Sequence, residues 1–246
     1  QDYLGLPIIA MAISLRATLR GKKRDDQKVI IYKSNLNEIE SFSLDELTYT
    51  KQRDYFKSGI NICKRAGLTF STGFDCQITS ELPINAGCSS SSAVMVSWIH
   101  FLSQIADQPA NWSPKKMGQL AYLAEVLEFK EPGGMMDQLS TSIGQLIYLE
   151  SEPGIKIRSI NSNFGTFVLG DSCEPKNTID ILRRCRDSRL AIIKKLKINN
   201  PSITIHSCDE NLDLSDLNQN ELLLFHGTVR NREILKDALL ELEKDF

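Results

Sequence analysis

The sequence lacks the features that mark several large classes of protein. No apolar run approaches the roughly 20 residues of a membrane-spanning helix, and no signal peptide is recognisable. Lysine and arginine number 29 against 31 acidic residues, so no basic excess favours nucleic acid. The 3 histidines are scattered and the 6 cysteines form no C-x-x-C pair, which excludes the common zinc patterns. These absences predict a cytoplasmic protein with free thiols that binds neither membranes nor nucleic acid.

The composition is that of an ordinary folded chain. Of the 246 residues, 41% are hydrophobic and 24% are charged, and the net charge is -2. A chain of this length can bury one large core or two smaller ones. The informative features are therefore local.

The chain contains a loop of small residues, 82–93, between a predicted strand and a predicted helix. Phe74, Cys76 and Ile78 alternate with polar residues, which predicts a half-buried strand over 74–80. After the loop, Val94, Trp98, Phe101, Leu102 and Ile105 follow helical spacing, so the helix begins in the serine run.

Such a loop can bind an anion through its backbone N–H groups and the helix dipole, and nucleotide phosphate is the expected ligand. The alternative is that the serines only cap the helix. No Gly-Lys-Ser/Thr follows the glycine, which excludes a Walker A loop.

Two further helices are predicted around this loop. The first covers about 53–66. The second starts with Ser113 as N-cap and Pro114 at its first position. Its buried side should carry Met117, Leu120, Leu123, Ala124 and Leu127. Within it, Glu125 is expected to point inward and Glu128 to face water, although either could be an ordinary surface carboxylate.

The ends of the chain carry weaker patterns. Alternation predicts one strand over 8–20, with 29–32 pairing back onto it as a hairpin, and a further strand over 166–169. Helices are predicted over 178–186 and within 220–246.

A second candidate site lies at the turn 132–138. Gly133 and Gly134 permit a tight turn, and Met136, Leu139 and Ile143 predict a helix after it. Asp137 then lies in the first helical turn, where it could act chemically or only compensate the helix dipole.

Taken together, these features resemble the GHMP kinase superfamily, and within it the galactokinase-like sugar kinases. The resemblance rests on Asp2-Tyr3 before the 10–13 strand, on the 83–93 loop, and on Met136-Asp137-Gln138 with Glu125 twelve residues before Asp137. It covers the whole chain, although the glycine-rich third motif of the family has no counterpart in these residues.

The resemblance implies roles for particular residues. ATP would be wrapped by the loop Asn85, Ala86, Gly87, Cys88, Ser89, Ser90 and Ser91, and Mg²⁺ would be held by Ser91 and Glu125. Asp2 and Gly134 would bind the sugar. Asp137 would contact it too and act as the catalytic residue by orienting or deprotonating the attacking hydroxyl.

The resemblance also implies the fold and the activity. We expect an α+β, two-lobed GHMP kinase fold, with an ATP-binding lobe over 1–150 and an incomplete second lobe over 151–246. The expected activity is transfer of the γ-phosphate of ATP to a monosaccharide hydroxyl at the anomeric position. The alternatives are a kinase for a heptose phosphate or another GHMP substrate, and a catalytically silent regulator that binds sugar and ATP.

Overall fold

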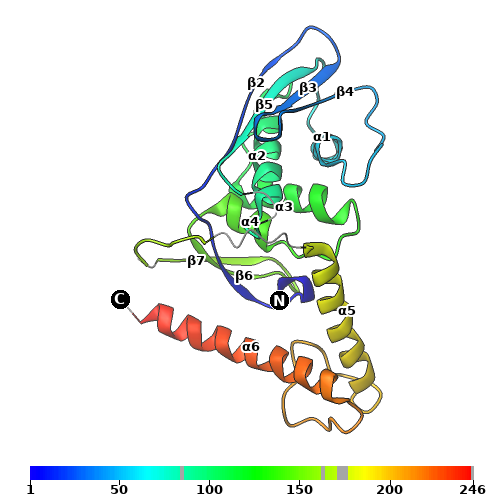
Figure 1. Cartoon of the computed structure of the whole chain (residues 1–246), viewed down its shortest axis with the longest axis vertical. Coiled ribbons are helices and arrows are strands. Elements are labelled where there is room, and N and C mark those ends of the chain that lie inside the picture. Colours follow the sequence, from blue (N-terminus) through cyan, green and yellow to red (C-terminus); the bar gives the residue numbers. More distant parts are fainter. Residues whose placement is uncertain (84–85, 162–163, 171–176, 245–246) are drawn as a thin grey trace.

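The structure is a computed structural model that describes residues 1–83, 86–161, 164–170 and 177–244 (Figure 1). It contains two β-sheets and three hydrophobic clusters. Among the described residues, no helix combines the length and apolar character needed to cross a bilayer.

The larger sheet has the strand order β2-β5-β3-β4. Its strands are β2 (Ala17–Lys23), β5 (Phe74–Ser80), β3 (Lys28–Lys33) and β4 (Glu38–Ser43). A short 3-10 turn, η2 (Ser34–Leu36), joins β3 to β4. The buried sides of β3 and β5 pack against α1 (Tyr55–Arg65) and α2 (Ser90–Ile105), with Trp98 fully buried at the centre. The predictions of β5 and of both helices are confirmed.

The prediction of one long strand over 8–20 is wrong. The chain forms β1 (Ile8–Met11) and β2, which belong to different sheets. The hairpin of 29–32 with this region is also wrong, because β5 lies between β2 and β3, antiparallel to the first and parallel to the second. Alternation identifies a strand but does not specify its partner, and here the partner comes from about fifty residues further along the chain.

The next segment is α3 (Pro114–Tyr122), which continues directly into a π-helical turn, η3 (Leu123–Leu127). Ser113 accepts a hydrogen bond from the N–H of Lys116, so the predicted cap is confirmed. The wider π turn shifts the helix face, leaving Leu123 and Leu127 37% and 48% exposed, contrary to prediction. Glu125 points inward as predicted.

The smaller sheet has the antiparallel order β1-β6-β7, with β6 (Leu146–Glu150) and β7 (Lys156–Ile160). Helix α4 (Met136–Ile143) buries Leu139 against Ile147 and Leu149 of this sheet. The 150/151 boundary between the predicted lobes stays a prediction, and β6 pairs with β7 across it.

The third cluster joins α5 (Thr178–Leu196), α6 (Gln219–Glu243) and the segment between them. Leu4 and Leu6 from the N-terminal segment, next to the 3-10 turn η1 (Asp2–Leu4), are buried in the same cluster. Figure 1 shows the N-terminus beside the start of α5. The long helix α6 begins near the other end of α5 and runs away from α5 toward the C-terminus. Helix α5 extends ten residues beyond the predicted 178–186.

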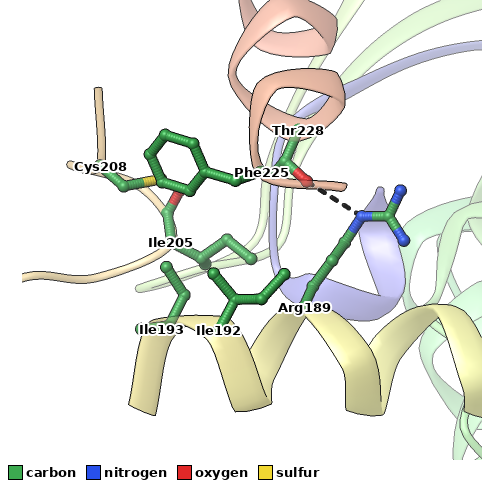
Figure 2. A pocket seen from close by; sticks show the side chains of 7 residues that line it. All are labelled: Arg189, Ile192, Ile193, Ile205, Cys208, Phe225 and Thr228. Atoms are coloured by element: carbon green, nitrogen blue, oxygen red, sulfur yellow. Dashed lines mark hydrogen bonds between the residues drawn. The ribbon is translucent and has the colours of Figure 1, made fainter. Parts of the chain in front are cut away.

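The strand predicted over 166–169 is not formed. These residues have no regular secondary structure, and Val168 is 93% exposed, so no sheet partner covers them. A small cavity in the third cluster is lined by Ile192, Ile193, Ile205, Cys208 and Phe225, with Arg189 and Thr228 at one side (Figure 2). Its volume of about 10 Å³ is room for one water molecule, so it is not a substrate site.

Candidate active site

The small-residue loop leads into the N-terminus of α2 as predicted. Gly87 has φ of 78° and Ser89, the N-cap residue, has φ of 53°, so the backbone is left-handed at both positions. Ser89 makes no side-chain cap bond, whereas a serine that caps by its hydroxyl adopts an extended backbone. Ala86, Gly87, Cys88, Ser90 and Ser91 lie at this helix end, and Asn85 lies outside the described residues.

Glu125 reaches this helix end from the π turn. Its side chain is 5% exposed, and its Oε2 accepts a hydrogen bond from Nε2 of Gln138 at 2.7 Å. The same amide lies 3.2 Å from the hydroxyl of Ser92. The structure therefore brings Glu125 to the first turn of α2, the turn that contains Ser91 and Ser92.

The environment of Glu125 disfavours its charge. Burial raises the pKa of Glu125, and the negative charge of Asp137 raises it further. Hydrogen bonds from Gln138, Ser91 and Ser92 oppose this rise. A cation near the carboxylate would favour its ionised form.

Asp2 binds the N-terminus of α4. Its Oδ2 accepts a hydrogen bond from the N–H of Met136 at 2.9 Å, which gives the positive end of the helix a carboxylate partner. A Cβ on Gly134 would lie 2.0 Å from the same oxygen, so only glycine leaves room for Asp2 here. The three predicted substrate residues, Asp2, Gly134 and Asp137, therefore lie together.

Asp137 lies in the first turn of α4, as predicted, and is half-buried. Its effect on the pKa of Glu125 places the two carboxylates within electrostatic reach of each other. The helix ends of α2 and α4 thus carry the phosphate-loop candidate and Asp137, and the π turn places the buried acid Glu125 beside them.

Two side chains of the site were not identified by the sequence analysis. Ser92 and Gln138 are both buried, and together they connect α2, the π turn and α4. Gln138 follows Asp137 directly, but neither its type nor its spacing indicates that it bonds Glu125. That contact depends on the packing of α4 against α2.

The residues present suit a magnesium ion bound together with phosphate. No group of three histidine, cysteine or acidic side chains capable of holding a metal exists in the described part of the chain. Mg²⁺ bound with nucleotides commonly takes one or two protein oxygens and completes its shell with phosphate and water. The Ser91 hydroxyl and the Glu125 carboxylate form such a partial donor set.

Comparison with known proteins indicates the protein family to which part of the chain is similar. Residues 54–145 match the family model described as GHMP kinases N terminal domain, a segment that runs from the start of α1 through α4. This part of the chain is therefore similar to the GHMP kinase N-terminal domain, and the chain has an α+β fold that matches the solved GHMP kinase structures.

Several curated proteins to which the chain is similar are galactokinases. The chain is 32% identical over 155 residues to galactokinase of Pyrococcus furiosus, covering 61% of this chain and 43% of that protein. It is 27% identical over 155 residues to galactokinase of Actinobacillus succinogenes, covering 60% of this chain and 39% of that protein. The chain thus spans about two-fifths of the length of these relatives, and is galactokinase-like in the part that it shares with them.

Solved structures agree on the fold. Galactokinase of Lactococcus lactis, solved with galactose, superposes with a TM-score of 0.77 at 20% identity, over 98% of this chain and 65% of that one. Mevalonate kinase of Methanococcus jannaschii gives a TM-score of 0.60 at 18% identity, over 95% and 75% of the two chains.

Proposed function

We propose that this chain is part of an ATP-dependent sugar kinase that transfers the γ-phosphate of ATP to a hydroxyl of a monosaccharide, at the anomeric position. The observation that carries the proposal is the meeting of two helix N-termini. The α2 terminus carries the left-handed small-residue loop, and the α4 terminus carries Asp137 beside Asp2. Similarity to galactokinases supports the substrate class.

In this proposal the phosphates of ATP bind the loop 85–91 through backbone N–H groups and the dipole of α2. Ser91 and Glu125 would hold Mg²⁺, which would offset phosphate charge when bound. Phosphoryl transfer needs alignment and charge neutralisation more than covalent chemistry, and this set of residues supplies both.

On the sugar side, Asp2 and the backbone at Gly134 bind hydroxyl groups. Asp137 accepts the proton of the attacking sugar hydroxyl while the oxygen of that hydroxyl bonds to the γ-phosphorus. The bond from that phosphorus to the oxygen bridging to the β-phosphate breaks, and ADP leaves. An aspartate with its intrinsic pKa of about 4 is a weak base, so the contribution of Asp137 depends on good positioning of the hydroxyl.

The proposal is tested by measuring ADP release from Mg·ATP with the product of the complete gene. The panel includes galactose, other free hexoses, heptose phosphates and mevalonate. We expect release with one free sugar, and NMR of the product would show phosphate on the anomeric carbon. Release only with a heptose phosphate or mevalonate would replace the substrate class. ATP binding without release across the panel would favour a silent regulator.

A further inference from the structure

The amide of Gln138 on α4 contacts both the buried Glu125 and Ser92 of α2. We propose that Gln138 is a positioning residue that holds the Glu125 carboxylate in the orientation that receives the nucleotide-bound divalent cation. This inference rests on the proposed function and adds Gln138, which is not among the site residues predicted from the sequence.

The contact is built into the core rather than the surface. Gln138 is 2% exposed, and its Nε2 lies 2.7 Å from Oε2 of Glu125 and 3.2 Å from Oγ of Ser92. Successive helical residues point about 100° apart. Gln138 therefore turns into the core while its neighbour Asp137 stays half-buried.

The chemistry of the pair fixes the direction of the amide. The ionised form of Glu125, which is the form that binds a cation, only accepts hydrogen bonds, so the nitrogen of Gln138 faces it in that state. The amide oxygen is buried and has no hydrogen-bond partner among the described residues. The orientation of the side chain is thus set by Glu125 and Ser92, and not by a partner of its own oxygen.

The consequence is a carboxylate with limited freedom. Glu125 stands on a π turn, and the bond from Gln138 fixes one of its oxygens against α2. Groups that orient a ligating carboxylate usually change metal affinity strongly when they are removed. A side chain present only for packing would not have this effect.

The test replaces Gln138 by methionine, which keeps a similar volume and removes the donor. Mn²⁺ binding to protein saturated with the ATP analogue AMPPNP is measured by electron paramagnetic resonance. Relative to the wild-type protein, we expect Gln138→Met to bind Mn²⁺ about 10 to 100 times more weakly. The affinity of the variant for AMPPNP in the absence of metal should be unchanged. In assays with ATP, raising the Mn²⁺ concentration should restore turnover.

Gln104→Met is the matched control, because Gln104 lies on the exposed side of α2 and bonds Ser103 and Ala110. It should bind Mn²⁺ as the wild-type protein does. If Gln138→Met shows no cooperative melting, Gln138→Asn is used, since it keeps an amide but withdraws it from Glu125. It should weaken Mn²⁺ binding in the same direction.

Mn²⁺ affinity within about twofold of wild type in a folded Gln138 variant would overturn this inference and leave the kinase proposal standing. Wild-type protein that binds neither AMPPNP nor Mn²⁺ with it would overturn both.

Discussion

At the scale of single residues, Glu125 combines a high burial with a charge that the protein alone supports poorly. The pKa of Glu125 is raised by burial and by the charge of Asp137. Hydrogen bonds from Gln138, Ser91 and Ser92 offset this rise only in part. Ionisable groups with such shifts are frequent at functional sites. Asp137, by contrast, is half-buried in the first turn of a helix, where an aspartate is favourable in any case.

Replacing Asp137 separates these roles. Asp137→Asn should lower kcat by about 10² to 10⁴, the usual contribution of an acid–base group, and leave ATP affinity nearly unchanged. Steady-state kinetics and calorimetry with ATP measure the two effects. Asp180→Asn makes the same change in the first turn of α5 and should keep wild-type turnover. If Asp137→Asn turned over at the wild-type rate, the residue would have no part in the reaction.

At the scale of elements, the π turn η3 is held by contacts from α1 and the segment before it. Ser58, fully buried on α1, donates a hydrogen bond to the carbonyl of Ala124 at 2.7 Å. Just past the turn, Glu128 accepts hydrogen bonds from Arg65 and Tyr49, so the prediction that it faces water is wrong. These contacts keep the widened turn that directs Glu125 inward.

Glu128 gives this element a pH-dependent stability. The hydrogen bonds from Arg65 hold its pKa below the ordinary value, with Tyr49 adding to the effect. A lowered pKa in the folded state contributes stability above the unfolded pKa of about 4.3, and this is lost as pH falls through the folded value. Glu128→Gln should therefore reduce the free energy of unfolding by about 1 kcal/mol at pH 7.

Urea denaturation at several pH values checks this prediction. The difference between the wild-type protein and Glu128→Gln should narrow as the pH drops below about 4. Glu46→Gln, at an exposed position, should show little difference at any pH. A stability difference that stayed constant down to low pH would mean that the ion pair is not its source.

At the scale of the whole molecule, the N-terminal segment connects two clusters. Leu4 and Leu6 are buried with the helices α5 and α6, while Asp2 binds the N-terminus of α4. The position of Asp2 therefore depends on a hydrophobic cluster outside the matched family domain. We infer that damage to this cluster near Leu6 reaches the sugar side of the site.

Leu6→Ala tests this connection. Leu6 is almost fully buried, so the change should destabilise the protein by about 2 to 5 kcal/mol. It should also raise KM for the sugar more than KM for ATP, as kinetics below the melting temperature would show. Leu217→Ala removes a buried leucine of the same cluster that is not part of the N-terminal segment, and it should lower stability without that selective change in KM. Equal changes in both KM values for Leu6→Ala would contradict the connection.

The sequence predicted the elements whose signals are local. Ser113 with Pro114 indicated the start of α3, alternation indicated β5, and the two glycines before Met136 indicated the turn that places Asp137 in the first turn of α4. Glu125 was correctly expected to point inward. These features depend on neighbours within a few residues, and a single sequence contains that information.

The tertiary structure decided the rest, because the deciding contacts join distant residues. The partner of β2 is β5 and not β3, and Ser58 meets the carbonyl of Ala124 across 66 residues of sequence. Asp2 reaches the N–H of Met136 across 134 residues. The amide of Gln138 meets Glu125 only where α4 packs beside α2. Periodicity shows which face of an element is apolar, but it cannot say which other element covers that face or how a turn widens to accommodate it.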